Sequence, residues 1–208
     1  MGPDKIAEAR ATLARVAGAL NRRNAVARVL PPLILLTDDQ RDADYAEAIR
    51  ALPLGSAIVI RHRNDAARRA MAQKLRDTAL QVNVRFLIAN DPALAADCDA
   101  DGVHASEASL GLIPIWRKRN IRWLITGAIH ATTPVEQIRD ADALLLAPVF
   151  ATPSHPRASP LGVEAFEAVA RRLRLPVYAL GGITSANVEQ LAASHAAGIA
   201  LIGGWLRS

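Results

Sequence analysis

Two short apolar runs in the second half of the chain each stop in a loop that is rich in glycine, proline, threonine or serine. They are residues 144–155, which read LLLAPVFATPSH, and residues 177–184, which read VYALGGIT. A helical pattern follows each of these loops. Regular alternation of apolar strand, loop and helix predicts an α/β protein with a parallel sheet, and eight such units close into a (β/α)₈, or TIM, barrel.

The alternation runs through nearly the whole chain. The expected strands are residues 33–37, 57–61, 85–89, 102–104, 123–127, 143–147, 177–180 and 199–202. The expected helices between them are residues 42–51, 65–80, 92–97, 107–119, 133–139, 162–173 and 185–194. About half of the residues are hydrophobic and few are aromatic, so Ala, Leu, Ile and Val must fill the core, as in strands that are buried on both faces.

An amphipathic helix over residues 4–27 precedes the barrel, and Pro31-Pro32 ends that segment. The chain stops soon after the eighth strand, which truncates the last helix. We expect residues 1–30 to be a helical extension that packs on a barrel of residues 31–208. It would cover the groove between strands eight and one, because soluble proteins rarely expose a large apolar patch. The alternative cover is a second subunit, as in a homodimer.

The charge and the N-terminus narrow the classes of partner. The formal net charge is +5, which fits either arginines spread over solvated helix faces or an anionic ligand. Nucleic acid is disfavoured, because no Lys/Arg run is interleaved with aromatic residues. The single cysteine, Cys98, excludes an internal disulfide. The charged N-terminus resembles neither a signal peptide nor a membrane span, so we expect a cytoplasmic protein.

Glycine pairs follow the last two expected strands. Gly181-Gly182 come after strand seven, and Gly203-Gly204 come after strand eight. In many barrels these two loops bind a phosphate group, because glycines let backbone N–H groups approach it. Glycines that only form tight turns are the alternative.

Charged or polar residues lie at or just after the ends of two of the expected strands. Arg61 and Arg63 end strand two, and the period-two alternation of a strand points both the same way. They suit a phosphate, a diphosphate or a carboxylate, or alternatively an ion pair with Asp38 or Asp91. Asn90 and Asp91 end strand three. Asp91 is either a ligand of Mg²⁺ or the N-cap of the helix that begins at Pro92.

Histidines and hydroxyl groups follow strands four to six. His104 and His130 are candidates for proton transfer or for structural hydrogen bonds. In the loop after strand six, Thr152 and Ser154 are candidate donors to phosphate oxygens, and His155 lies beside them.

Taken in order, the motifs resemble those of the thiamine phosphate synthase / TenI family over residues 33–206. The matching pieces are Leu36-Thr-Asp38, Arg61-x-Arg63, Asn90-Asp91, Asp101-Gly-Val-His104, Gly127-Ala-Ile-His130, Pro148-Val-Phe-x-Thr152, Pro160-Leu-Gly162, Gly181-Gly-Ile-Thr184 and the final glycine pair.

The resemblance implies one of two chemistries for this barrel. A synthase of thiamine biosynthesis couples hydroxymethylpyrimidine diphosphate to thiazole phosphate, with Mg²⁺ and cationic side chains helping diphosphate to leave. A TenI-type tautomerase aromatises a thiazole carboxylate phosphate and needs proton transfer but no metal and no other cofactor. A non-catalytic binder of thiazole phosphate or thiamine phosphate is the third option.

The chain departs from the synthase pattern in the half of the site that handles pyrimidine and diphosphate. Val59 replaces a Gln, Arg63 replaces a Lys, and Ser109 replaces the second Asp that would bind metal. Ile129 replaces a Ser, and His155 replaces a Lys that meets diphosphate. Glu107 is the one nearby carboxylate that would compensate at the metal.

We therefore expect a synthase-like enzyme whose metal and pyrimidine half is degenerate. In that interpretation Asp91 would hold Mg²⁺, while Arg61, Arg63 and His155 would meet diphosphate. In the tautomerase interpretation His130 would move the proton and Arg61 would hold the substrate carboxylate. In either case a small phosphorylated heterocycle would be bound by Asn90, Thr152, Ser154 and the four glycines of the last two loops.

Overall fold

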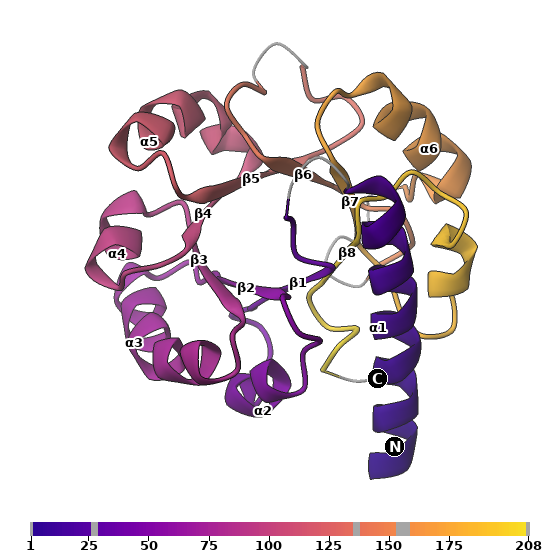
Figure 1. Cartoon of the computed structure of the whole chain (residues 1–208), viewed down its shortest axis with the longest axis horizontal. Helices are drawn as coiled ribbons and strands as arrows, with labels where there is room; N and C mark the ends of the chain where they lie inside the picture. Colours follow the sequence, from indigo (N-terminus) through magenta and orange to yellow (C-terminus); the bar gives the residue numbers. More distant parts are fainter. Residues whose placement is uncertain (1, 26–28, 135–137, 153–158, 207–208) are drawn as a thin grey trace.

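Eight parallel strands close into a barrel in the computed structural model, which describes residues 2–25, 29–134, 138–152 and 159–206 (Figure 1). Strand order follows the chain, and the last strand pairs with the first. The strands are β1 (Leu33–Leu36), β2 (Ala57–Ile60), β3 (Arg85–Ala89), β4 (Gly102–Ala105), β5 (Leu124–Ile129), β6 (Ala143–Leu146), β7 (Val177–Leu180) and β8 (Ile199–Leu201). The predicted (β/α)₈ barrel is confirmed.

Helices surround the barrel, each lying between two successive strands, and one long helix precedes it. They are α1 (Pro3–Asn24), α2 (Tyr45–Arg50), α3 (Asp65–Gln81), α4 (Pro92–Asp97), the 3₁₀ turn η1 (Glu107–Leu112), α5 (Ile113–Arg119), α6 (Gly162–Arg172) and the 3₁₀ turn η3 (Val188–Leu191). Three of them begin where a side-chain oxygen accepts the N–H group three residues along, which stabilises a helix start. These N-caps are Asp44, Asn64 and Asp91.

Two of the expected helices differ from the structure. The helix expected over residues 185–194 is wrong, because only the short turn η3 forms there. Asn187 accepts the N–H of Thr184 and donates to the carbonyl of Gly182, and such local bonds compete with a helix. The helix expected over residues 107–119 is split into η1 and α5 near Pro114, which has no N–H group to continue the earlier turn.

A third expected helix, over residues 133–139, is not tested by the structure. Residues 135–137 lie outside the described residues, and their described neighbours are turns or irregular. That expectation therefore remains untested.

Alternate strand residues fill the inside of the barrel. One apolar cluster contains every second residue of several strands, which the two-residue period of a strand places on one face. Its strand members include Ile34, Leu36, Ala57, Val59, Leu87, Ala89, Leu145, Tyr178, Leu180 and Ala200. Apolar strand residues of the other register pack outward against the helices in a second, larger cluster. Continuing the inward alternation past the strand ends places Asp38, Arg61 and His130 at the mouth.

The segment before β1 closes the amino-terminal end of the barrel. Leu30 is buried in the inner cluster, and the Tyr178 hydroxyl donates to the carbonyl oxygen of Pro31 over 2.5 Å. The Asn21 side chain on α1 donates to the carbonyl of Ala197 over 3.0 Å. The opposite end, where strands lead into loops, is where a ligand would have to enter.

The groove beside β8 is covered by α1 and by Trp205. In Figure 1, α1 lies along the side of the ring occupied by β8, and its first turns extend beyond the ring. Leu13 and Leu20 on its apolar face are fully buried. Arg10 lies over the Trp205 ring at 5.4 Å and forms a two-point ion pair with Glu47. The Trp205 indole N–H donates to the carbonyl of Ala48 over 3.0 Å.

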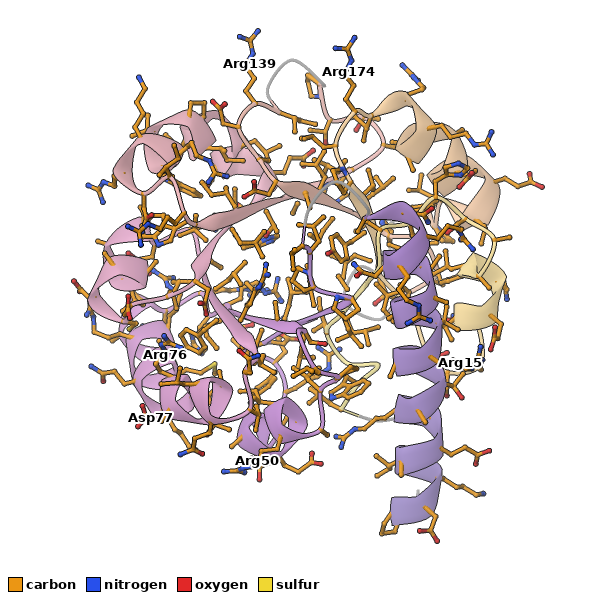
Figure 2. The ribbon with its side chains drawn as sticks, in the orientation of Figure 1. Arg15, Arg50, Arg76, Asp77, Arg139 and Arg174 are labelled. Carbon is orange, nitrogen blue, oxygen red and sulfur yellow. The ribbon has the colours of Figure 1, made fainter. Side chains whose placement is uncertain are left out.

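The charged side chains labelled in Figure 2 show where much of the basic surface lies. Arg50, Arg139 and Arg174 point outward from the perimeter of the molecule. Their positions favour the interpretation of the net charge as arginines on solvated faces. Among the described helices, none is both long and apolar enough to span a membrane.

We expect the cover provided by α1 to contribute measurably to the free energy of unfolding. Leu13 is 0% exposed, so Leu13→Ala should lower this free energy by about 2–5 kcal/mol in urea denaturation. Leu80 on α3 is 64% exposed, and Leu80→Ala is the matched control, with an expected change below about 0.5 kcal/mol. If both substitutions lowered the free energy of unfolding equally, the packing of α1 against the barrel would not contribute to stability.

Candidate active site

Arg61 is held rigidly at the mouth of the barrel by the end of β1. Its Nε donates to the carbonyl oxygen of Thr37 over 3.2 Å, and its backbone N–H donates to the Thr37 hydroxyl over 2.7 Å. A terminal nitrogen lies 3.7 Å from Oδ1 of Asp38, so the predicted pairing with Asp38 is confirmed. Burial lowers the pKa of Arg61, an effect that Asp39 opposes, yet a guanidinium stays charged at neutral pH.

Arg63 lies further out, with a looser partner. Its Nε is 3.4 Å from a carboxylate oxygen of Asp39, and its side chain is 80% exposed. Exposed pairs of this kind contribute little to stability. Arg63 can therefore turn toward an anionic ligand at low cost, whereas Arg61 is already oriented.

Asp91 is engaged on both carboxylate oxygens. Oδ1 accepts the Leu94 N–H over 2.9 Å, which confirms the N-cap interpretation, and Oδ2 accepts from Arg68 over 3.1 Å. Burial alone would raise the pKa of Asp91, but the Leu94 N–H and Arg68 outweigh it and lower that pKa. Arg68 is itself mostly buried and also meets Asp65.

These residues do not fit a magnesium ion held by the protein. Mg²⁺ requires several oxygen ligands in octahedral geometry, and the Asp91 carboxylate is already matched by a guanidinium. Ser109, in place of the second carboxylate, lies 3.1 Å from the Ser106 hydroxyl. The Glu107 carboxylate is hydrogen-bonded to His130 and Thr133. Over the described ranges, no three His, Cys, Asp or Glu side chains come together as a metal site.

His130, Glu107 and Thr133 form a hydrogen-bonded group at the end of β5. His130 Nδ1 lies 2.9 Å from Oε2 of Glu107, and the Thr133 hydroxyl donates to the other oxygen of the same carboxylate. The Thr133 hydroxyl, first, and His130 together lower the pKa of Glu107. An ionised Glu107 can only accept a hydrogen bond, so the Nδ1–H group of His130 is the donor and Nε2 is the ring nitrogen left to face a ligand.

His104 is a buried structural group rather than a proton shuttle at neutral pH. Its Nδ1 lies 2.8 Å from the Thr126 hydroxyl inside the barrel. Burial, assisted by the positive charge of Arg61, lowers the pKa of His104 to about 4. The imidazole is therefore neutral at pH 7.

The glycine loops after β7 and β8 pack backbone against backbone. Gly181 and Gly182 have φ values of +97° and +67°, a region that favours glycine. A Cβ atom at Gly182 would lie 2.4 Å from the carbonyl oxygen of Ala151 in the loop after β6, and one at Gly204 would lie 2.3 Å from that of Ile183. The loops after β6, β7 and β8 thus form one continuous surface, as a phosphate cradle requires.

Other predicted ligands are only partly placed. Asn90 has a φ of +56°. Its Oδ1 accepts the Ser106 N–H over 2.8 Å, which connects the loop after β3 to the loop after β4. Thr152 is half-buried in the loop after β6. Ser154 and His155 lie outside the described residues. Ligand contacts of these four residues stay predictions.

Three partner residues were not found from the sequence. Arg41 in the loop after β1 pairs with Asp38, Arg68 on α3 pairs with Asp91, and Thr133 bonds Glu107. Each lies away from a strand end, so period-two alternation gives no information about its direction. Among these three pairs, the Asp-x-x-Arg spacing of Asp38 and Arg41 is the one sequence signal that could have revealed a local ion pair.

The fold and the positions of these groups define a (β/α)₈ barrel with its candidate site at the carboxyl ends of the strands. A family model described as thiamine monophosphate synthase (TMP-TENI) matches residues 33–204. The chain belongs to this family.

Individual relatives agree with the family match. The chain is 30% identical over 178 residues to a thiamine-phosphate synthase of Chloroflexus aurantiacus, covering 82% of each protein. It is 32% identical over 182 residues to one of Methanocella arvoryzae, covering 82% of this chain and 84% of the relative. A solved thiamine phosphate pyrophosphorylase from Pyrococcus furiosus shares the fold, with a TM-score of 0.69, 24% identity and 88% coverage of both chains.

Because His104 is buried, the free energy of unfolding should depend on pH. The pKa of His104 is near its usual value of 6.5 in the unfolded chain, whereas in the folded chain it is about 4. The stability should therefore fall as the pH falls through this window. We expect His104→Gln, which cannot titrate, to lose about 2–3 kcal/mol less than the wild type between pH of about 7 and about 4.5. Urea unfolding at both pH values measures this, and identical losses in the two proteins would contradict it.

Proposed function

We propose that the protein is a thiamine-phosphate synthase-type transferase. It would join the methylene carbon of hydroxymethylpyrimidine diphosphate to the ring nitrogen of thiazole phosphate. The observation that carries this proposal is the position of Arg61, an oriented cation at the barrel mouth, with Arg63 beside it. The match to thiamine monophosphate synthase over residues 33–204 supports the same reaction.

The chemistry requires stabilisation of a leaving anion. The carbon–oxygen bond to diphosphate breaks, the electron pair leaves with diphosphate, and the thiazole nitrogen lone pair forms the new carbon–nitrogen bond. Arg61 is fixed by the Thr37 carbonyl before substrate arrives, and such preorganised charge is worth most where a negative charge develops. We derive no step through Mg²⁺, because Asp91 is already occupied by Arg68 and Leu94.

A thiazole tautomerase is the second candidate, and the pair of His130 and Glu107 favours it. A carboxylate that orients an imidazole through Nδ1 produces a general base at Nε2. Such an enzyme would move a proton on the thiazole ring with His130 while Arg61 holds the substrate carboxylate. This reaction needs neither metal nor diphosphate.

One product assay distinguishes the candidates. Purified protein is mixed with the pyrimidine diphosphate, the thiazole carboxylate phosphate tautomer and Mg²⁺, and products are followed by mass spectrometry. We expect thiamine phosphate, and we expect Arg61→Met to lower its rate about 100-fold or more. Arg15→Met is the matched control, because Arg15 is an exposed residue of α1 that pairs with Glu189.

The other outcomes of the assay assign the alternatives. Absence of thiamine phosphate from the wild type would contradict the synthase. Aromatised thiazole that forms in EDTA and is lost in His130→Asn would establish the tautomerase. Thermal stabilisation by thiazole phosphate with no turnover would leave a binding protein. Loss of thiamine phosphate in EDTA would return Asp91 to the role of metal ligand.

A further inference from the structure

Gly203 differs from the other glycines of the last two loops in what a side chain would meet there. At Gly181, Gly182 and Gly204 an added Cβ atom would lie within 3.0 Å of backbone atoms of a neighbouring loop or residue. At Gly203 it would lie 3.0 Å from Nε and 3.3 Å from Cζ of Arg41. Gly203 does not have a left-handed φ. The missing side chain at Gly203 therefore makes room for a guanidinium.

The topology explains why Arg41 reaches this position. Arg41 lies in the loop after β1, and β1 pairs directly with β8, with Leu35 opposite Leu201. Parallel pairing brings the loops after both strands to the same end of the barrel. Arg41 thus extends across the strand pair that closes the barrel and lies against the backbone of the β8 loop.

Asp38 fixes the Arg41 side chain in place. Oδ2 of Asp38 is paired with Nη1 of Arg41, and Oδ1 accepts the Gln40 N–H over 3.1 Å. The Arg41 side chain is 18% exposed and that of Asp38 is 5% exposed. Since Asp38 also lies 3.7 Å from Arg61, a single buried carboxylate orients two guanidiniums at the mouth.

The β8 loop needs such a cation if it is to bind an anion. In the described residues β8 leads into a single turn, in which the Leu206 N–H donates to the carbonyl of Gly203 over 3.2 Å. One turn has a much smaller dipole than the full helix that supports phosphate in many barrels. A guanidinium forms charge-assisted bonds to phosphate oxygens and fits their geometry.

We propose that Arg41 is a phosphate ligand, which together with the backbone N–H groups of Gly203 and Gly204 binds the phosphate monoester of the substrate. The identity of this monoester as thiazole phosphate rests on the proposed function. The placement of an anion next to Arg41 does not depend on that function, because it is argued from the contacts of Arg41 with Asp38 and Gly203.

The test measures the affinity for two probes by titration calorimetry: thiazole phosphate and the corresponding thiazole alcohol, which lacks the phosphate. We expect Arg41→Met to weaken binding of thiazole phosphate about 10- to 100-fold, with Arg41→Lys in between. Affinity for the alcohol should change less than about twofold. Arg15→Met, which removes the same charge from an exposed site, should leave both affinities unchanged.

A second variant keeps the proposal falsifiable if Arg41→Met folds poorly. Gly203→Ala should shift the guanidinium by a few tenths of an ångström and weaken phosphate binding measurably but less than Arg41→Met does. The double variant should bind no more weakly than Arg41→Met alone. Gly111→Ala is the matched control, because an added Cβ there meets nothing within 4 Å. Thermal unfolding confirms that each variant is folded.

Three results would overturn the proposal. They are wild-type affinity for thiazole phosphate in folded Arg41→Met or Gly203→Ala, equal loss of affinity for phosphate and alcohol, and failure of the wild type to bind thiazole phosphate. Failure of the proposed function looks different. In that case the wild type binds thiazole phosphate and Arg41→Met binds it more weakly, as expected, but no thiamine phosphate is formed.

Discussion

The parallel pairing of β8 with β1 is the contact on which the rest of the molecule depends. It closes the sheet, and closure brings the loops after β8, β1 and β2 next to one another at one end. Gly203 lies against Arg41 there, although the two are far apart in the sequence, and Asp38 joins Arg41 to Arg61. The pairing also creates an apolar groove outside the barrel, which α1 and Trp205 cover. The site and the unusual cover are thus two consequences of one closure.

The charged groups at the mouth contribute little to folding compared with the apolar residues below them. Asp38 is 4% exposed, and taking such a carboxylate and its cations out of water costs free energy that their attraction barely offsets. Orientation is what the arrangement provides: Arg41 faces the β8 loop, and Arg61 faces the opening. A site that must bind one phosphate and release another anion needs cations that are fixed before the ligands arrive.

The sequence was sufficient for the barrel because its signal is local. Leu33–Leu36, Ala57–Ile60 and Val177–Leu180 are unbroken apolar runs between turn residues, and their order implies the topology. The expected helix over residues 185–194 failed because a side chain, Asn187, satisfies the backbone of the turn. No periodicity in the sequence reveals that competition.

The site was predictable only where strand alternation applies. Arg61 and His130 come directly after strands, so their direction follows from the register. The partners that decide what these groups and Asp91 can do come from helices and loops: Arg68 occupies Asp91, and Thr133 fixes Glu107. The family resemblance implied a metal site that had lost one carboxylate, while the residues alone left Asp91 open as a metal ligand or an N-cap. The structure adds that the remaining carboxylate is bound to a guanidinium.

The central claim is that the loops after β7 and β8, completed by a cation from the loop after β1, bind the phosphate of a small heterocycle. A crystal structure of the protein with thiazole phosphate tests it most directly. The account predicts the phosphate on the backbone N–H groups of Gly182, Gly203 and Gly204, within hydrogen-bond distance of the Arg41 guanidinium. A phosphate seated instead between Arg61 and Arg63, with the glycine loops empty, would contradict it.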